Sequence, residues 1–260
     1  SSWNYINKIW NVSRFIKMNL DANQYENQSI DEEQLQDIDK WIIAKFNNLI
    51  DVVNYNYDQY ELGEVAKAIY NFVYDDLASN YLEMTKVTFN KEDQILKINT
   101  CAVLKEMLTG VIKLLHPFTE EIYQHFHQGS IMVSAWPTKY TYDCLENYDF
   151  SNCEKLFEII KAVRTVRTEY NVAMSKKINL ALESTNEALR SFLNGHTEYL
   201  EKFVNYDHLT IDSNIAKNNA IVNVLTDVNV VIPSNDLINF EEELAKLNAQ
   251  EQKLQAEVAR

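Results

Sequence analysis

Glycine and proline are scarce in this chain, which has four of the first and three of the second among its 260 residues. Folds made of many short strands need these two residues at their turns, so the scarcity argues against a sandwich or a barrel. Hydrophobic residues make up 46% of the sequence, which is enough for a substantial core. The sequence therefore favours long helices joined by short connections.

The first part of the chain repeats apolar residues at three- and four-residue spacing, the period of an amphipathic helix. Stretches long enough for several helical turns cover residues 3–19, 35–57, 60–84 and 93–115. The last of these stops before Pro117, and a short fifth helix is expected to begin with Thr119 as its N-cap. Long helices with short links indicate an antiparallel bundle, which we assign to residues 1–149.

The pattern changes after the predicted bundle. A helix is predicted over about 151–169, and residues 178–183 then alternate apolar with less apolar side chains, as a half-buried strand does. A helical stretch over 186–205 is interrupted by a glycine, and short strands follow it. Residues 150–233 are therefore predicted to form a small α+β module.

The last stretch, 234–260, has a third pattern. Its apolar residues occupy the a and d positions of a single heptad register: Leu237, Phe240, Leu244, Leu247, Leu254 and Val258. Three heptads do not make a stable helix alone, so we expect this segment to pair with another helix. The predicted fold is mainly α, with a bundle, a small α+β module and a C-terminal coiled-coil helix.

The charge of the chain limits its partners. A formal net charge of −14 argues against non-specific binding of DNA, RNA or a membrane surface, because such binding needs a positive field. The basic residues are nevertheless segregated: residues 1–20 carry three cations and no acid, and residues 161–177 carry five cations and one acid. A specific RNA site on one of these two basic islands is compatible with the acidic total.

The remaining composition points to a reducing compartment and offers no catalytic motif. The three cysteines form no CxxC pair, and the sequence shows neither a signal peptide nor an apolar run of membrane length, so a cytoplasmic setting is expected. No glycine-rich nucleotide loop, HExxH or paired carboxylate motif occurs. His125 and His127 are two residues apart, which would place them on different faces of a helix, so no metal site is expected.

The second basic island ends in the sequence AMSKK, which invites three interpretations. It could be a lysine loop that holds ATP, but such loops lie beside a nucleotide-binding fold, and here the segment joins a predicted helix to a predicted strand. It could be an ordinary basic connection. It could also contact an RNA backbone, since lysine neutralises phosphates without reading sequence.

The N-terminal helix offers a better candidate for specific recognition. Its sequence WNVSRFIKMNL places Trp10 and Phe15 among the cations Arg14 and Lys17. Aromatic rings can stack on the bases of an unpaired RNA loop, and arginine can bind a base edge or a phosphate. The alternative is that Trp10 and Ile16 belong to the core and that Phe15 merely flanks it.

Six segments follow one another in an order typical of one family: WNVSRFIKMNL, DKWIIAKFNNLI, YELGEVAKAIYNFVYDDL, LLHPFTEEIY, SIMVSAWP and VRTVRTEYNVAMSKKI. They resemble the C-terminal half of the valyl-tRNA synthetases, class I synthetases of the valine, isoleucine and leucine group. The closing DLINFEEELAKLNAQEQKL resembles the first helix of that family's coiled-coil arm. Isoleucyl and leucyl relatives share the bundle, whereas the WNxSRF start, the RxExNVxxSKK run and the heptad ending favour the valyl family.

The resemblance implies a class I anticodon-binding fold whose bundle docks on the anticodon stem-loop of tRNA(Val). ATP-dependent aminoacylation, with its ATP and Mg²⁺, would belong to a catalytic domain outside this chain, so the fragment is expected to hold no cofactor and to be inactive alone. Asn11, Arg14 and Phe15 match the NxSRF motif and are expected on the anticodon side, with Lys17 beside them. Four cations of the second basic island are expected to contact the tRNA backbone: Arg164, Arg167, Lys176 and Lys177.

The resemblance further implies a monomeric parent enzyme that binds neither DNA nor a membrane. Two departures from the family pattern concern packing: Phe118 runs directly into Thr119, without the usual insert, and residues 78–80 read ASN where the family often has Cys-Asp-Trp. The rival hypothesis is a helical module that pairs with another protein through its heptad tail. An equivalent domain of an isoleucyl- or leucyl-tRNA synthetase is a further alternative.

Overall fold

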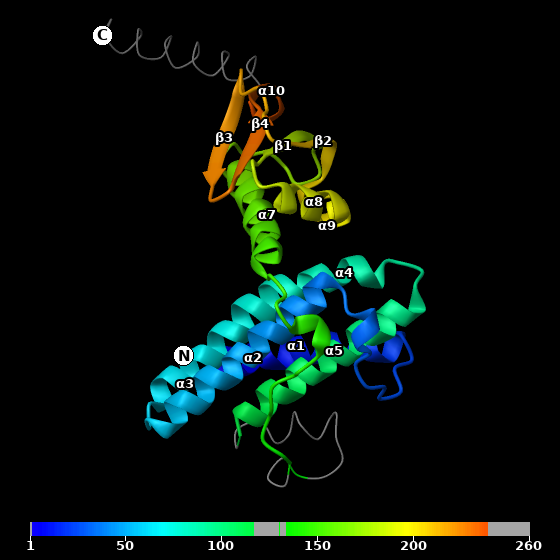
Figure 1. Cartoon of the computed structure of the whole chain (residues 1–260), viewed down its shortest axis with the longest axis vertical. Coiled ribbons are helices and arrows are strands. Elements are labelled where there is room, and N and C mark those ends of the chain that lie inside the picture. The colour runs from blue at the N-terminus through cyan, green and yellow to red at the C-terminus, as the bar shows by residue number, and fades with distance from the viewer. Residues whose placement is uncertain (1, 117–129, 131–133, 239–260) are drawn as a thin grey trace, which may run out of the picture. The chain divides into compact units, whose positions relative to one another are not determined.

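The computed structural model describes residues 2–116, 130 and 134–238, with the backbone alone for residues 2–6 (Figure 1). The chain divides into two compact units, Ser1–Cys153 and Glu154–Arg260. We call them the first and the second unit and describe each by itself. The division lies in the first turn of a helix, a few residues beyond the boundary predicted at 149.

The described part of the first unit is helical, as the spacing of its apolar residues predicts (Figure 1). The main helices are α1 (Ser2–Ala22), α2 (Asp37–Asp58), α3 (Leu62–Asn71), the π-helix η2 (Phe72–Tyr81), α4 (Leu82–Phe89) and α5 (Gln94–Leu114). Two short 3-10 turns, η1 (Glu32–Gln34) and η4 (Asp143–Leu145), lie in the connections. The short helix predicted to begin at Thr119 lies outside the described residues.

Helix α5 forms the centre of the bundle. It is buried along nearly its whole length from Asn99 to Ile112, which is the pattern of a helix enclosed by others. Its contact with α2 depends on Gly110, because a Cβ atom at this position would lie 2.1 Å from Cζ of Phe46. The absence of a side chain at Gly110 therefore lets the Phe46 ring pack directly against the α5 backbone.

The stretch 60–84, predicted as a single helix, contains a π-helical segment that the sequence pattern does not reveal. Tyr81, the last residue of η2, is fully buried, and its hydroxyl donates a 2.6 Å hydrogen bond to Oδ1 of Asp39. The backbone N–H of Gln36 donates to Oδ2 of Asp39 at 2.9 Å. This buried network fixes the start of α2 against η2.

The described part of the second unit contains one sheet together with helices, as predicted for an α+β module. Its elements in chain order are α7 (Ser151–Glu169), β1 (Ile178–Glu183), α8 (Glu187–Gly195), α9 (Thr197–Val204), β2 (Tyr206–Asp212), β3 (Ala220–Leu225), β4 (Val228–Pro233) and α10 (Ser234–Leu237). The strand order is β2-β1-β4-β3. Strand β1 pairs with β2 in parallel and with β4 in antiparallel orientation, and β3 and β4 form a hairpin.

The alternation along β1 follows the prediction. Ile178, Leu180 and Leu182 are buried on the helix-covered face, and the residues between them are half-buried. Because the side-chain period of a strand is two, this register assigns each residue to its face without ambiguity.

The assignment of Leu237 to a coiled-coil seam is wrong. Leu237 is buried in the second unit at the end of α10, and the next residue, Ile238, has extended backbone angles that end the helix. Its apolar side chain is therefore used in the core of the module. The other five residues of the predicted heptad register lie outside the described residues.

Candidate nucleic-acid interface

Helix α1 has one buried and one exposed face, and the predicted anticodon residues are on the exposed one. Ile9, Val12, Ile16 and Leu20 are buried and define the inward side. Asn11, Arg14 and Lys17 are exposed. Residues three apart on a helix are neighbours, so these three side chains form one continuous outward stripe. We call Asn11, Arg14 and Lys17 the α1 stripe.

The alternative in which both Trp10 and Ile16 belong to the core holds for only one of the two residues. Ile16 is fully buried, but Trp10 keeps 37% of its surface exposed, next to the α1 stripe. Phe15 is half-buried, between the two faces. Part of the Phe15 side chain is therefore accessible, and its predicted role on the anticodon side stays a prediction.

The two cations of the α1 stripe differ in their contacts, and Arg14 has the fewer. Within the described residues it makes no ion pair and no hydrogen bond, and it is exposed. Lys17 pairs with Asp21 at 3.5 Å, an exposed pair of the kind that stabilises a helix by less than about 1 kcal/mol. Both cations of the stripe can therefore bind a phosphate without breaking a strong interaction within the protein.

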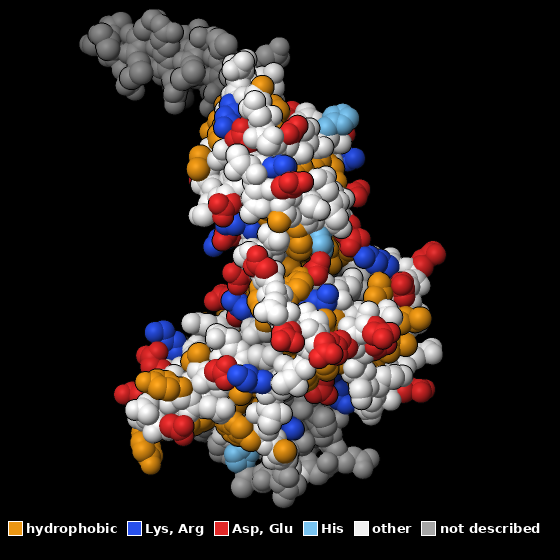
Figure 2. Space-filling view, in the orientation of Figure 1, with side chains coloured by type: hydrophobic (Ala, Val, Ile, Leu, Met, Phe, Trp, Pro, Cys, Tyr) orange, Lys and Arg blue, Asp and Glu red, His pale blue; other side chains and the backbone are white. Residues whose placement is uncertain are grey.

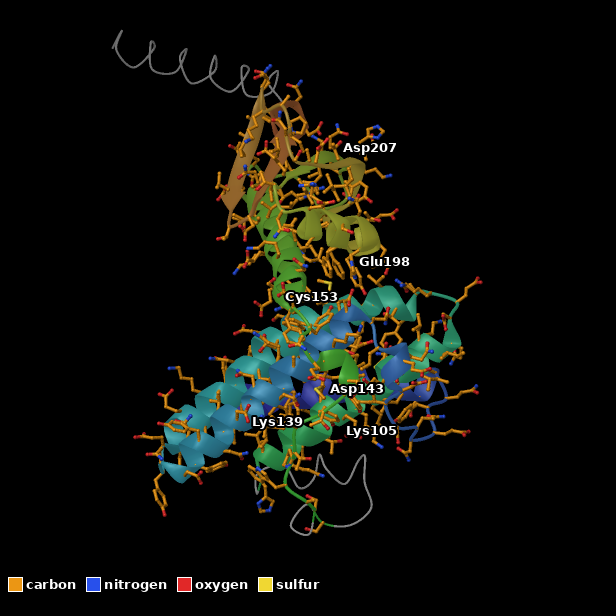
Figure 3. The ribbon with its side chains drawn as sticks, in the orientation of Figure 1. Lys105, Lys139, Asp143, Cys153, Glu198 and Asp207 are labelled. Carbon is orange, nitrogen blue, oxygen red and sulfur yellow. The ribbon has the colours of Figure 1, made fainter. Side chains whose placement is uncertain are left out.

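Two lysines elsewhere in the first unit, labelled in Figure 3, have local partners instead. Lys139 pairs with Asp51 at 2.9 Å, and Lys105 donates to the side chain of Asn27. Burial lowers the pKa of Lys105. On the face of the molecule shown in Figure 2, acidic and basic side chains are interspersed. The buried Lys105 therefore serves the fold, whereas Lys139 lies in an exposed ion pair like that of Lys17.

An aromatic pair beside α1 extends the candidate interface and was not predicted from sequence. The rings of Tyr70 and Tyr74 stack at 4.3 Å between centroids, and the ammonium of Lys8 lies 5.0 Å from the centroid of Tyr74. Tyr70 is 41% exposed. The i, i+4 spacing of the two tyrosines could have predicted their stacking on a helix. The contact with Lys8 of α1 depends on the fold and could not be predicted from this spacing.

The second basic island lies in the second unit and is less uniform than predicted. Arg164 is exposed on α7, with its guanidinium 5.5 Å from the centroid of the Phe203 ring. Lys176 and Lys177 are exposed in the connection between α7 and β1, and the ammonium of Lys176 donates to the backbone oxygen of Asp236 at 2.7 Å. Their predicted contacts with the tRNA backbone stay predictions.

Arg167 contradicts its predicted role as an RNA contact. Its side chain is only 1% exposed, and its guanidinium donates to four backbone carbonyls, those of Ala173, Lys176, Val204 and Asn205, at 2.8 to 3.2 Å. Burial lowers the pKa of this group. A guanidinium enclosed in this way cannot reach a phosphate, so Arg167 is a structural residue.

The described residues form no candidate metal site. No three His, Cys, Asp or Glu side chains among them are grouped so that they could hold a metal ion.

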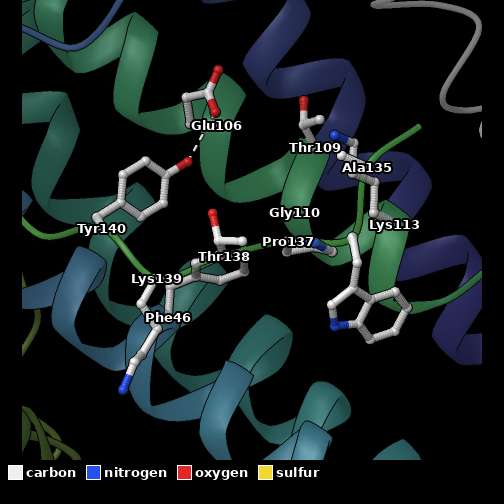
Figure 4. A pocket seen from close by; sticks show the side chains of 11 residues that line it. Phe46, Glu106, Thr109, Gly110, Lys113, Ala135, Pro137, Thr138, Lys139 and Tyr140 are labelled. Carbon is white, nitrogen blue, oxygen red and sulfur yellow. Dashed lines mark hydrogen bonds between the residues drawn. The ribbon is translucent and has the colours of Figure 1, made fainter.

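A cavity of about 290 Å³ lies between α2, α5 and the segment 135–140 (Figure 4). In it the Tyr140 hydroxyl donates a hydrogen bond to the Glu106 side chain at 2.9 Å. Burial, together with the Glu106 charge, raises the pKa of Tyr140, so the Tyr140 phenol stays protonated and does not act as a nucleophile. No helix in the described part of the chain is long and apolar enough to cross a membrane.

Comparison with known proteins adds an independent finding. The family model described as "Anticodon-binding domain of tRNA ligase" matches residues 39–182, which is more than half of the chain. A valine–tRNA ligase of Bacillus anthracis is 39% identical over 254 residues, covering 95% of this chain and 29% of the relative. Valine–tRNA ligases of Bacillus subtilis (38%) and Listeria monocytogenes (37%) are similar to the whole chain, which covers 30% of each.

Proposed function

The chain belongs to the family of anticodon-binding domains of tRNA ligases, and we propose that it recognises the anticodon stem-loop of tRNA(Val). Similarity to valine–tRNA ligases over 95–100% of the chain supports the choice of valine over isoleucine and leucine. The chain spans about 30% of the length of these relatives. We propose that it acts as the anticodon-binding part of a valine–tRNA ligase, a monomeric enzyme of the cytoplasm.

The observation that supports the proposal best is the α1 stripe with Trp10 beside it. Arg14 is exposed and has no partner among the described residues, and beside it lie the amide of Asn11 and the partly exposed indole of Trp10. Such groups suit the recognition of an unstacked RNA loop. Arginine and asparagine bind base edges and phosphates, and each base stacked on an aromatic ring contributes about 1–3 kcal/mol. The first 38 residues precede the match to the family model, but the similarity to the Bacillus subtilis enzyme includes them.

The chemistry of aminoacylation is assigned to the part of the enzyme beyond this chain. The described residues contain no metal-binding group and no nucleotide-binding fold beside the AMSKK segment. We therefore propose that ATP and Mg²⁺ bind elsewhere in the parent enzyme and that this chain alone does not charge tRNA. Its contribution is to select the tRNA and to hold it for the catalytic part.

A mobility-shift titration of the 260-residue chain with valine, isoleucine and leucine tRNAs at two salt concentrations tests the proposal. We expect the tightest binding for valine tRNA, with affinity that falls with salt at a log–log slope of about −0.7 to −0.9 for each phosphate neutralised. Lys17→Gln should weaken binding. Lys86→Gln, which removes a lysine from a similar helical ion pair with Glu83 in α4, is the matched control. Equal affinity for all three tRNAs would refute the proposed specificity.

A further inference from the structure

The carbonyl groups of the connection between α7 and β1 accept hydrogen bonds from two side chains of the second unit, Arg167 and Asn205. Arg167 donates to the oxygens of Ala173 and Lys176, both at 2.8 Å. The side-chain amide of Asn205 donates to the oxygens of Met174 and Ser175, both at 3.0 Å. Four consecutive carbonyls, those of residues 173–176, therefore point toward donor side chains of the second unit, and we call this side of the turn inward.

The two donor side chains are themselves fixed. The Arg167 guanidinium also donates to the carbonyls of Val204 and Asn205, at 2.8 and 3.2 Å, so the end of α9 is tied to the same group. Asn205 has left-handed backbone angles, with φ of 57°, a conformation that asparagine tolerates better than most residues. The connection is consequently built as a rigid turn and not as a free loop.

The inward carbonyls determine where the amides point. In a trans peptide unit the C=O group and the N–H group of the next residue point in opposite directions. The N–H groups of Met174 and Ser175 therefore point outward, while the N–H of Lys176 closes the turn on the Ala173 oxygen at 3.1 Å. Among the described residues, no acceptor receives a hydrogen bond from the amides of Met174 or Ser175.

The charges around this turn favour an anion. Lys176 is exposed within the turn, and Lys177 is exposed and directly follows it in sequence. The nearest acids in sequence and contact are Glu169, exposed at the end of α7, and Asp236, whose carboxylate accepts a 2.7 Å hydrogen bond from the Asn179 backbone. Successive outward amides beside a cation form the kind of concavity in which proteins bind phosphate oxygens.

We propose that the amides of Met174 and Ser175, together with Lys177, bind a phosphate of the tRNA backbone. Arg167 and Asn205 are positioning residues, which act by turning the carbonyls inward and the amides outward. The identity of the RNA rests on the proposed function, whereas the anion site rests on this geometry alone. A nucleotide is the less suitable ligand, because the turn has no nucleotide-binding fold beside it.

Three variants separate the parts of the site in a salt-dependent tRNA titration. Met174→Pro removes one amide at the second position of the turn, where proline is tolerated, and should weaken binding roughly tenfold without changing the salt slope. Lys177→Gln should lower the magnitude of the log–log slope by about 0.9. Lys202→Gln, which removes an exposed lysine of α9 in the same unit, is the control and should change neither quantity.

Asn205→Gly tests the positioning role, because glycine accepts the left-handed backbone while removing the amide side chain. We expect several-fold weaker tRNA binding. The double variant with Met174→Pro should weaken tRNA binding by a clearly smaller factor than the product of the two single-variant factors, since both changes act on one site. A purely structural role would lower the thermal midpoint of the second unit and give independent effects on binding, which would overturn the positioning role.

Nuclear magnetic resonance separates this inference from the proposed function. The Met174 and Ser175 amide signals should shift when the labelled chain is titrated with valine tRNA or with inorganic phosphate at constant ionic strength, and Met174→Pro should abolish the effect at Ser175. Shifts with phosphate but not with tRNA would overturn the assignment to RNA. The absence of shifts with either ligand would overturn the anion site, even if tRNA binds elsewhere on the chain.

Discussion

Asp39 carries a carboxylate that is fully buried in the helical bundle, and this burial makes the stability of the first unit depend on pH. The hydrogen bonds from Tyr81 and from the Gln36 backbone favour the ionised form. Burial opposes them and dominates, so that the pKa of Asp39 is raised from 3.8 to about 6. The folded state therefore binds a proton in a pH range in which the unfolded chain has already released it.

The size and the sign of the effect follow from these two values. A pKa difference of this size corresponds to about 3 kcal/mol in the free energy of unfolding. Because the pKa of the folded state is the higher one, the stabilisation is complete below about pH 4 and is lost as the pH rises through about 6. Other carboxylates change stability over the same range, so the effect has to be measured as a difference between the protein and an Asp39 variant.

Asp39→Asn is the suitable variant, because its side chain can accept from the Gln36 N–H and donate to the Tyr81 hydroxyl oxygen. All four tryptophans of the chain lie in the first unit, so tryptophan fluorescence during urea unfolding reports on that unit alone. From about pH 3 to 8 the variant should gain about 3 kcal/mol relative to the unchanged protein, with the midpoint near pH 5, halfway between the two pKa values. Tyr81→Phe, which removes a hydrogen bond to the carboxylate, should move the midpoint upward. A difference that stays constant over this range would refute the reasoning.

Three further substitutions have expected outcomes. Gly110→Ala should destabilise the first unit by about 1–3 kcal/mol in urea unfolding, because the new methyl group would overlap the Phe46 ring, and Phe46→Leu in the same chain should recover part of the loss. Arg167→Met leaves four carbonyls without their donor and should destabilise the second unit by about 3–5 kcal/mol, seen as faster amide exchange in β1 and β2 with an unchanged tryptophan transition. Arg14→Ala should weaken tRNA binding about tenfold without changing the urea midpoint, and equal losses of binding and stability would contradict its assignment to the interface.

Local periodicity predicted the elements of this fold well. The faces of α1 follow from the three- and four-residue spacing of its apolar residues, and β1 occupies the residues whose side chains alternate. These signals depend only on neighbours in sequence. The π-helix η2 is not visible in this periodicity, and its last residue, Tyr81, bonds to Asp39, which lies 42 residues away in sequence.

Arg167 shows how a general rule failed. Arginine is rarely buried, so a cation within a basic island was assigned to the surface. The apolar stripe of α7 contained the opposite indication: Leu156, Ile160 and Val163 are buried, and Arg167 continues the same i, i+4, i+7, i+11 series. Its carbonyl partners come from two connections of the module, which no local pattern could bring together.

The candidate interface was only partly predictable for the same reason. The basic and aromatic residues of α1 are close in sequence, so their outward stripe could be anticipated. The Tyr70–Tyr74 stack reaches Lys8 only through the packing of α1 against η2. The heptad pattern was misleading at its first position, since Leu237 fits the register but packs in the α+β module.

Photo-crosslinking from the α1 stripe would decide whether this surface holds the anticodon. A photoreactive phenylalanine derivative at position 11, an exposed site one turn before Arg14, is irradiated with valine tRNA, and the crosslinked nucleotides are mapped by primer extension. Crosslinks within the anticodon loop, lost when the anticodon is exchanged, are the expected result. Crosslinks to the acceptor stem, or equal yields with either anticodon, would contradict the assignment of α1 to anticodon recognition.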